Sequence, residues 1–359
     1  MISFSIDDFK TVGMTPGLAQ HLQRQALTPH PEGALMRVTA IHRETLTLHD
    51  GQLEHSARAL PRLQREMLDL QTALNVGDWV LTTEDDQGAL WVVHRPEPLT
   101  TLARKDADGH HHTVVSNVDT AFLVMGLDDD FNPQRLERYL ALVQGNGVLA
   151  VVVLTKADGA PGLAEARVAE LRDRLGNALD IVAVDGRSPD ATAALQPYLG
   201  LGQTVVMLGS SGAGKSTLTN TLLGQQRQDT GAVRMHDSRG KHTTTARTLH
   251  CLAGGACVID TPGVRTLSPC VDAATLAQVF DDIGQLSQQC RFRDCQHGDE
   301  PGCAVRAGVH PSRLKNYQKL LRESQRDQRS VFERQAQLAV WKVRSKAVRA
   351  KNKLTSEWG

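Results

Sequence analysis

The sequence predicts a multidomain protein with an N-terminal β-barrel, a central α/β domain and a C-terminal α-helical domain that carries a metal site. Three observations predict this architecture: short strand patterns at close spacing over residues 33–98, long apolar runs that alternate with helical patterns over 99–272, and a cysteine/histidine cluster followed by basic helical sequence over 273–359. At 359 residues the chain is long enough for several hydrophobic cores. Residues 1–32 show weak periodicity and are expected to form a poorly ordered N-terminal extension.

The composition is that of a water-soluble globular chain. Hydrophobic residues make up 40% and charged residues 22% of the sequence, and 40 Lys and Arg balance 40 Asp and Glu, so net charge points to no particular partner. The first residues lack the charged and apolar segments of a secretory signal, and no apolar run approaches the roughly 20 residues that a membrane span requires. We therefore expect a cytoplasmic protein with no membrane partner. We also expect it to act as a monomer, although the sequence itself does not give the oligomeric state.

Residues 33–98 carry short strands separated by turns. The clearest strand patterns are Leu46–Leu48, Gly77–Leu81 and Trp91–Val93. Strands this short and this close in sequence are typical of a small barrel, and we predict an OB-fold. Pro96 and Pro98 then mark a linker to the next domain.

Five apolar runs follow, as expected for parallel strands that are buried on both faces. They are Ala121–Met125, Val148–Leu154, Ile181–Val184, Val205–Leu208 and Cys257–Ile259. Between the first two runs, Asn132 and Pro133 are a good N-cap and first residue for a helix that we expect to end at Gly145. Strands that alternate with helices predict a doubly wound parallel sheet.

A phosphate-binding loop is predicted at G-S-S-G-A-G-K-S-T, directly after the fourth apolar run. The segment satisfies the pattern G-x-x-x-x-G-K-S, in which glycines let backbone N–H groups curl around phosphates. Lys215 would reach the terminal phosphates, and the Ser216 hydroxyl would bind Mg²⁺. We assign nucleotide binding to the whole loop: Gly209, Ser210, Ser211, Gly212, Ala213, Gly214, Lys215, Ser216 and Thr217.

Two companion motifs also stand at the ends of apolar runs. In D-T-P-G, Asp260 would hold Mg²⁺ through water, and the backbone N–H of Gly263 would sense the γ-phosphate. In T-K-A-D, the Asp158 carboxylate would accept hydrogen bonds from the N1–H and 2-amino groups of guanine, whereas adenine offers neither donor on that edge. Lys156 would lie along the plane of the base. The candidate guanine-binding residues are Thr155, Lys156, Ala157 and Asp158.

The T-K-A-D motif also has a purely structural explanation. By itself such a segment more often marks the N-cap of a helix, and only the other two motifs favour guanine recognition. Thr155 also stands where GTPases commonly carry Asn, so it keeps a hydroxyl group but loses the amide.

Between the phosphate loop and D-T-P-G lies the segment G-K-H-T-T-T. It suits a switch loop that orders when a threonine meets Mg²⁺ and the γ-phosphate; an exposed polar loop is the alternative. We assign the switch to Thr244 and Thr245, with Thr243 left open. Val264 follows D-T-P-G where many GTPases carry a water-orienting Gln, so we expect slow unassisted hydrolysis. His242 is the candidate to orient the water, with contact to a phosphate or a partner as its alternative role.

A second candidate site is the cluster C-x₄-C-x-H-x₅-C. Three thiolates and one imidazole with no open position are typical of a closed, structural zinc site. A short segment with little apolar content needs such a metal in order to fold, although unrelated thiols are the alternative. We predict one Zn²⁺ per chain, bound by Cys290, Cys295, His297 and Cys303.

The helical pattern from about Pro311 to Lys353 is rich in Lys and Arg and has few acids. Charged residues on a helix usually mark only the face that is exposed to solvent. Beside a zinc module and a barrel, however, a one-sided excess favours a partner with a phosphate backbone, most simply RNA.

The order of the motifs is the most informative feature of the chain. T-K-A-D precedes the phosphate loop and D-T-P-G follows both, whereas an ordinary GTPase carries the guanine motif last. This permuted order, the N-terminal barrel and the C-terminal cluster together resemble the small-ribosomal-subunit-dependent GTPase A (RsgA) family of circularly permuted GTPases. The G-K-H-T-T-T segment and Asn117-Val118-Asp119 are also similar to that family, and the resemblance covers about residues 35–310.

The resemblance implies a GTPase that binds the small ribosomal subunit, contacts its rRNA through the barrel and zinc domains, and assists a late step of its maturation. GTP, bound with Mg²⁺, would be hydrolysed to GDP and phosphate with stimulation by the subunit. We hypothesise that loss of the γ-phosphate moves the zinc domain, which directly follows the D-T-P-G switch, and so releases the RNA. Two alternatives stay open: an RNA-binding assembly factor in which nucleotide is mainly structural, and a P-loop ATPase or kinase, which T-K-A-D disfavours.

Overall fold

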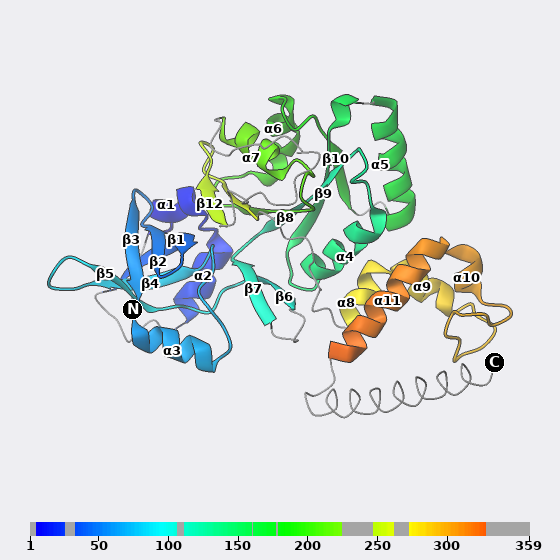
Figure 1. Cartoon of the computed structure of the whole chain (residues 1–359), viewed down its shortest axis with the longest axis horizontal. Helices are drawn as coiled ribbons and strands as arrows, with labels where there is room; N and C mark the ends of the chain where they lie inside the picture. The colour runs from blue at the N-terminus through cyan, green and yellow to red at the C-terminus, as the bar shows by residue number, and fades with distance from the viewer. Residues whose placement is uncertain are drawn as a thin grey trace, which may run out of the picture. The chain divides into compact units, whose positions relative to one another are not determined.

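A computed structural model describes the chain over residues 5–25, 33–105, 111–159, 161–176, 179–224, 247–261 and 273–327. The chain divides into two compact units, Met1–Val271 and Asp272–Gly359. The first unit holds a barrel and an α/β sheet, and the second is helical (Figure 1). Within the described ranges, no helix combines the length and the apolar character needed to cross a membrane.

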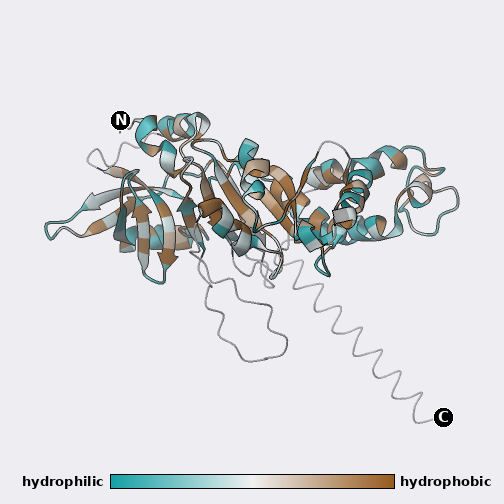
Figure 2. Cartoon of the chain, turned by 90° about the horizontal axis from the view of Figure 1, so that it is seen from above, coloured by the Kyte–Doolittle hydropathy of each residue, from teal (hydrophilic) through white to brown (hydrophobic). Residues whose placement is uncertain are grey.

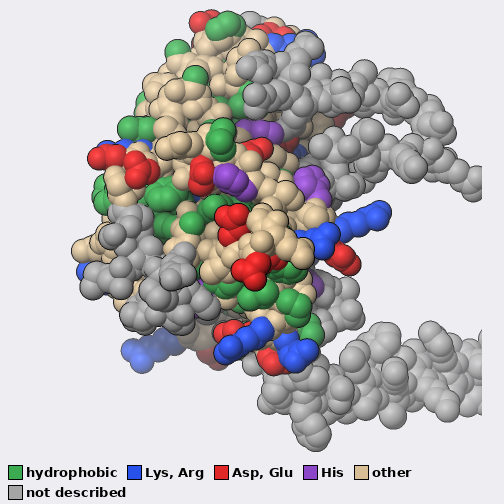
Figure 3. All heavy atoms as spheres, turned by 90° about the vertical axis from the view of Figure 1, so that its left-hand side faces the viewer, with side chains coloured by type: hydrophobic (Ala, Val, Ile, Leu, Met, Phe, Trp, Pro, Cys, Tyr) green, Lys and Arg blue, Asp and Glu red, His purple; other side chains and the backbone are tan. Residues whose placement is uncertain are grey.

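Five strands close into the predicted barrel. They are β1 (Ala34–His42), β2 (Thr45–His49), β3 (Glu54–Ala59), β4 (Trp79–Glu84) and β5 (Leu90–His94). The strand order is β1-β2-β3-β5-β4, and β4 pairs back onto β1 to close the ring. Strands β3 and β5 run parallel, and α3 (Pro61–Asp69) connects β3 to β4. This topology is that of an OB-fold. Figure 3 faces the barrel and shows acidic and histidine side chains over the middle of this face, with Lys and Arg near its rim.

The prediction of a poorly ordered N-terminal extension is wrong for residues 5–25. This segment forms α1 (Ile6–Phe9), a 3₁₀ turn η1 (Lys10–Val12) and α2 (Pro16–Arg24), with the Thr15 side chain capping α2. Its apolar side chains pack on the barrel residues Leu35, Trp79 and Leu81. The Phe9 and Trp79 rings meet edge to face, with centroids 5.4 Å apart. The segment is therefore ordered by tertiary packing.

The α/β part contains the predicted parallel sheet. Its strands are β8 (Thr120–Gly126), β9 (Leu149–Thr155), β10 (Asp180–Ala183), β11 (Thr204–Leu208), β12 (Thr248–Cys251) and β13 (Cys257–Asp260). They lie in the order β10-β9-β8-β11-β13-β12, all parallel except β12, which is antiparallel to β13. Each of the five apolar runs became one of the five parallel strands, and Figure 2 shows these strands as the most hydrophobic part of the chain.

Helices cover both faces of this sheet. They are α4 (Pro133–Gln144), α5 (Pro161–Leu175), α6 (Asp190–Leu195) and α7 (Lys215–Leu223), with short 3₁₀ turns η2 (Ala157–Gly159) and η3 (Gln196–Tyr198). Helix α4 begins as predicted, because the Asn132 side chain accepts a hydrogen bond from the Arg135 N–H, and Gly145 is its C-cap. One sheet face packs on α6 and α7 in a single apolar cluster. Figure 1 shows α4 and α5 on the other side of the sheet.

The barrel and the sheet are joined by main-chain pairing and by one buried arginine. Strand β1 pairs antiparallel with β12 at Ala40 and Thr248, so that both parts belong to one 11-stranded sheet. Arg37 is fully buried at this junction and donates hydrogen bonds to the Thr204 hydroxyl at 2.9 Å and the Asn117 carbonyl at 3.0 Å. It also donates to the carbonyl of Val12 in the N-terminal segment. A hairpin of β6 (Thr101–Lys105) and β7 (His111–Ser116) precedes β8.

The described part of the second unit, residues 273–327, consists of four helices and the loop between α9 and α10. Its helices are α8 (Ala273–Val279), α9 (Asp281–Ser287), α10 (Ala304–Gly308) and α11 (Pro311–Asp327). Phe280 is buried and packs against Tyr317, and Arg313 makes a two-bonded ion pair with Asp282. Residues 328–353, which include most of the predicted basic helix, lie outside the described residues.

Candidate functional site

The parallel strands bring the predicted motifs to one edge of the sheet. Thr155 ends β9 beside Gly126 at the end of β8, and Asp260 ends β13 beside Met207 of β11. Since the carboxyl ends of parallel strands share an edge, T-K-A-D, the phosphate loop and Asp260 all lie there. In doubly wound sheets this edge is where ligands bind.

The phosphate loop requires its glycines. A Cβ on Gly209 would lie 2.2 Å from the Val124 carbonyl oxygen, so only glycine allows the loop to leave β11 this close to β8. Gly212 and Gly214 have φ of +85° and +91°, a backbone region that L-residues rarely adopt. Helix α7 then begins at Lys215, which directs its first free N–H groups toward the loop.

Lys215 is folded onto the phosphate loop. Its Nζ donates hydrogen bonds to the carbonyl oxygens of Gly209 at 2.9 Å and Ser210 at 2.7 Å, and the residue is 6% exposed. Burial lowers the pKa of the Lys215 ammonium, and the charges of Asp260 and Asp130 oppose this shift. A buried ammonium held beside a glycine-rich loop suits an anionic, phosphate-bearing ligand.

Ser216 and Asp260 form a pair of oxygen ligands. The Ser216 hydroxyl donates to Oδ2 of Asp260 at 3.0 Å, and Asp260 is 3% exposed. Its other oxygen, Oδ1, is buried and has no hydrogen-bond partner among the described residues. A buried carboxylate oxygen without a partner is unfavourable in an empty site, and hydroxyl and carboxylate oxygens are the ligands that Mg²⁺ prefers. The pair therefore fits a magnesium ion.

The T-K-A-D motif is hydrogen-bonded to the phosphate loop. The hydroxyl of Thr155, 1% exposed, donates to the Ala213 carbonyl at 2.6 Å. The Lys156 ammonium donates to the Gly212 carbonyl at 2.8 Å, and Lys156 adopts φ of +63°. Asp158 follows in η2 and is exposed. The Thr155 hydroxyl thus links T-K-A-D to the phosphate loop, and the Asp158 carboxylate is exposed and accessible to a base.

The loop after β8 was missed as part of the site. Asp130 accepts a hydrogen bond from the Ser210 hydroxyl at 2.5 Å and pairs with Arg135 of α4. Asp128 pairs with the Lys156 ammonium at 2.5 Å. In this acidic loop, the Asp130 carboxylate therefore holds a side chain of the phosphate loop, and the Asp128 carboxylate holds a side chain of T-K-A-D. The signal in the sequence was the acidic run at the end of a buried strand.

Several predicted residues cannot be placed. The segment that contains His242, Thr244 and Thr245 lies outside the described residues, and so do Gly263 and Val264. Their assigned roles stay predictions. Asp260 is the last functional residue of D-T-P-G that the structure places.

The cysteine/histidine cluster comes together in the second unit. One ligand atom from each of Cys290, Cys295, His297 and Cys303 lies within 4.8 Å of all the others. The His297 Nδ1 atom is 3.7 Å from the Cys290 sulfur and 3.6 Å from the Cys303 sulfur. Zn–S bonds of about 2.3 Å in a tetrahedron place sulfur atoms about 3.8 Å apart, and the Cys290 and Cys303 sulfurs are 4.0 Å apart. The cluster fits a closed, four-ligand metal site.

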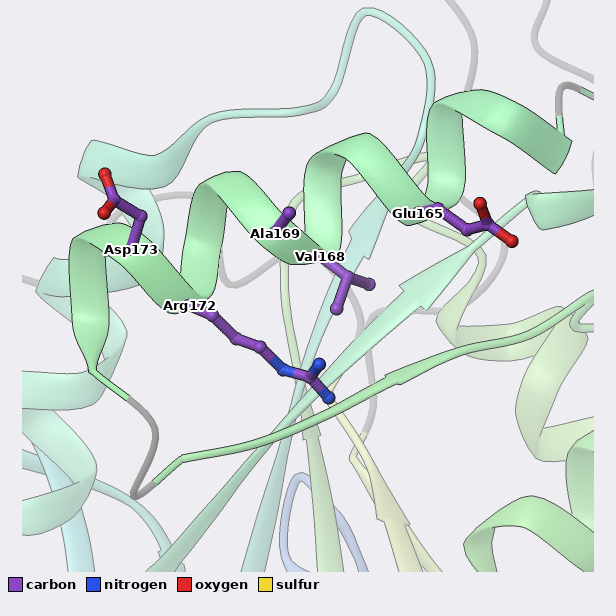
Figure 4. Close-up of a pocket in the computed structure, with 5 residues that line it drawn as sticks. All are labelled: Glu165, Val168, Ala169, Arg172 and Asp173. Carbon is purple, nitrogen blue, oxygen red and sulfur yellow. The ribbon is translucent and has the colours of Figure 1, made fainter.

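The surface also has a shallow hollow that is separate from both clusters. Its lining residues all come from α5: Glu165, Val168, Ala169, Arg172 and Asp173 (Figure 4). A hollow on one face of one helix offers no convergent polar groups, so it is not a candidate for chemistry.

Comparison with known proteins agrees with this geometry. The sequence model of the RsgA GTPase family matches residues 96–269. The protein named small ribosomal subunit biogenesis GTPase RsgA from Xanthomonas euvesicatoria pv. vesicatoria (strain 85-10) is 46% identical over 314 residues, which is 85% of each chain. The protein of the same name from Xanthomonas axonopodis pv. citri (strain 306) is 46% identical over 302 residues, or 82% of each chain.

Two solved structures share the fold. The crystal structure of YjeQ from Thermotoga maritima superposes with a TM-score of 0.59 at 24% identity, covering 83% of this chain and all of that chain. YloQ, described as a circularly permuted GTPase, gives a TM-score of 0.55 at 20% identity and covers 84% of this chain and 99% of its own. The predicted fold class, a barrel followed by a permuted GTPase domain, is confirmed.

Proposed function

The chain belongs to the RsgA GTPase family, and from this premise we propose that it assists a late step in maturation of the small ribosomal subunit and hydrolyses GTP there. Membership makes it a GTP-hydrolysing enzyme. The observation that carries the proposal is the convergence of Lys215, Ser216, Asp260 and T-K-A-D at one edge of the sheet.

Each part of the nucleotide site has a proposed role. Residues Gly209–Thr217 hold the phosphates, and Thr155–Asp158 select guanine. Ser216 and Asp260 would hold Mg²⁺, which supplies positive charge against the phosphate oxygens. The Asp128 and Asp130 carboxylates keep the two loops in register through Lys156 and Ser210.

The remaining catalytic roles rest on the sequence alone. We propose that Thr244, Thr245 and Gly263 respond to the γ-phosphate and that His242 orients the attacking water. Because Val264 cannot hydrogen-bond water, hydrolysis would be slow until a partner completes the site.

The proposed partner is the small ribosomal subunit and its rRNA. We assign the contacts to a barrel domain over residues 33–98 and a zinc domain over 273–359, on either side of a GTPase domain over 99–272. Residues 1–32 precede the barrel as an N-terminal extension, of which the described residues 5–25 pack on the barrel. The metal of the cluster would be Zn²⁺, since three thiolates and one imidazole suit it best. The protein would act as a monomer in the cytoplasm.

GTP turnover measured with and without purified small subunits tests this function. We expect the subunits to raise the rate at least about tenfold, as expected when a partner completes an unfinished site. Equal rates would instead favour an RNA-binding factor in which nucleotide is mainly structural. Large subunits at the same concentration are the control.

The Thr155 hydroxyl should be required for nucleotide binding. Thr155→Val keeps the side-chain shape but leaves the buried Ala213 carbonyl without its donor, at a cost of about 1–3 kcal/mol. We expect GTP affinity to fall about tenfold, whereas Thr155→Ser should bind like the parent. Titration with a fluorescent GTP analogue measures both. Equal affinity of the Val and Ser variants would contradict the role of this hydroxyl.

Base recognition by Asp158 predicts a change of nucleotide preference. Asp158→Asn loses two hydrogen bonds to the charged carboxylate, so GTP affinity should fall about a hundredfold. The amide N–H₂ can donate to the additional carbonyl of xanthine, so xanthosine triphosphate should then bind better than GTP. Asp173→Asn, an exposed change on α5, is the matched control. Unchanged GTP affinity in Asp158→Asn would refute the base-reading assignment.

A further inference from the structure

The metal-binding loop of the second unit exposes an aromatic ring. Phe292 lies between Cys290 and Cys295, and its exposed fraction is 42%. The other large hydrophobic side chains that are exposed in the described part of the chain are all leucines of the first unit. A phenyl ring exposed in this way offers a large apolar face to a ligand.

The backbone around Phe292 is fixed on both sides. The Phe292 carbonyl accepts a hydrogen bond from the Cys295 N–H at 3.3 Å, and the Arg291 N–H donates to the Gly302 carbonyl at 3.1 Å. Gly302 has φ of +74°, and a Cβ there would lie 3.0 Å from the Arg291 Cβ. The loop is thus closely packed, and its fixed backbone holds the Phe292 ring in an exposed position.

Two arginines flank the ring directly, and the exposed Asp294 follows them in the same loop. The guanidinium carbon of Arg291 lies over the Phe292 ring, 5.5 Å from its centroid, and Arg291 and Arg293 are both exposed. Gln318 of α11 donates a hydrogen bond to the His297 carbonyl at 3.2 Å, which holds α11 against the same loop. Exposed basic residues stand on the corresponding face of α11 at spacings of four and three: Lys315, Lys319 and Arg322.

The exposed ring and the neighbouring basic side chains together favour one class of ligand. A protein partner would be expected to cover a contiguous apolar patch, but Phe292 is the one exposed large hydrophobic side chain among the described residues of its unit. An exposed aromatic ring flanked by two arginines matches the surface on which unpaired nucleobases stack while arginines and lysines contact the phosphates.

We propose that Phe292 is a stacking platform for an unpaired base of RNA. In this arrangement Arg291 and Arg293 contact the phosphates on either side of that base, and the basic face of α11 extends the path of the backbone. The inference rests on the proposed function for the source of the RNA, but it concerns one ring and can be tested on RNA alone.

The test uses the full chain with zinc bound and a fluorescein-labelled single-stranded 12-nucleotide RNA of mixed sequence, followed by anisotropy. Phe292→Leu keeps an apolar side chain but removes the ring, and we expect it to weaken binding about tenfold, the lower range for loss of one stacked base. Phe292→Trp should bind at least as tightly as the parent. Leu163→Ala, another exposed apolar residue, is the matched control. Zinc content confirms that each variant keeps its loop.

Two comparisons make the outcome decisive. A 12-base-pair duplex of the same sequence should bind the parent and Phe292→Leu equally, because its bases are not available for stacking. Equal binding of the single-stranded RNA by Phe292→Leu and the parent overturns the proposal. A loss of affinity of Phe292→Leu for small subunits, without a loss of affinity for the RNA, also overturns it, because that result marks a contact with a ribosomal protein. If small subunits do not stimulate GTP hydrolysis by the parent chain, the proposed function is refuted. The RNA-binding measurement still tests the role of Phe292 in that case.

Discussion

Replacement of Lys215 by alanine is expected to lower kcat/KM for GTP by about 10²- to 10³-fold, the usual effect of removing one preorganised charge from a phosphate site. Lys215 is 6% exposed and already faces the loop through its bonds to the Gly209 and Ser210 carbonyls. The ammonium therefore needs little reorganisation to meet the terminal phosphates. The loss should appear both in nucleotide affinity and in turnover, because the charge on the phosphates is present in the ground state and is redistributed in the transition state.

Two variants separate this effect from misfolding. Lys215→Met keeps most of the buried aliphatic chain and should lose as much activity as Lys215→Ala while melting close to the parent. Lys10→Ala removes an ammonium that is paired with Asp7 on the surface, and its activity should match the parent. A Lys215→Met variant that turns over GTP at the parental rate would show that the loop binds phosphates without this lysine.

Removal of the metal is expected to unfold the second unit and leave the first intact. A structural zinc site contributes about 10–16 kcal/mol of apparent binding free energy, as much as or more than the 5–15 kcal/mol that stabilises a whole domain. Residues 273–327 have only a small core to offset this loss, and the two units are compact separately. After chelation, or in Cys295→Ser, proteolysis should cut within residues 273–327 while the remainder still binds GTP.

Elemental analysis gives the matching measurement. The parent should carry about one zinc per chain, and Cys295→Ser should carry much less. Cys251→Ser removes a thiol outside the cluster and should retain the metal. A chain without zinc, or a second unit that resists proteolysis after chelation, would contradict a structural metal here.

The sequence predicted those parts of the structure whose determinants are local. The parallel strands were recognisable because burial on both faces demands continuous apolar runs, as in Val205–Leu208. Helix α4 was recognisable because its cap is a local hydrogen bond of Asn132. The residues of the predicted phosphate loop and of the cysteine/histidine cluster could be singled out by residue type and spacing, and the structure brings the members of each group together.

The rest depends on contacts between segments far apart in the chain. Residues 5–25 form elements too short to show periodicity, and Phe9 and Met14 gain order only by packing with Trp79. The role of Asp130 could not be predicted either, because it depends on the pairing of β8 with β11, which places the acidic loop beside Ser210. Similarly, Thr155 departed from the common motif in a way that only the distance to Ala213 explains.

The pairing of β1 with β12 has a consequence for how the chain can be divided. An open sheet must protect the free N–H and C=O groups of its edge strand, since an exposed edge recruits strands from other molecules. Strand β12 lies at one edge of the GTPase sheet, opposite β10, and the barrel pairs with it at Thr248 and Ala40. Arg37 adds a hydrogen bond to Thr204 at the start of β11, the strand that precedes the predicted phosphate loop. The barrel therefore protects this edge of the GTPase sheet. A GTPase domain expressed without the barrel would expose β12 and would be prone to aggregate through that strand.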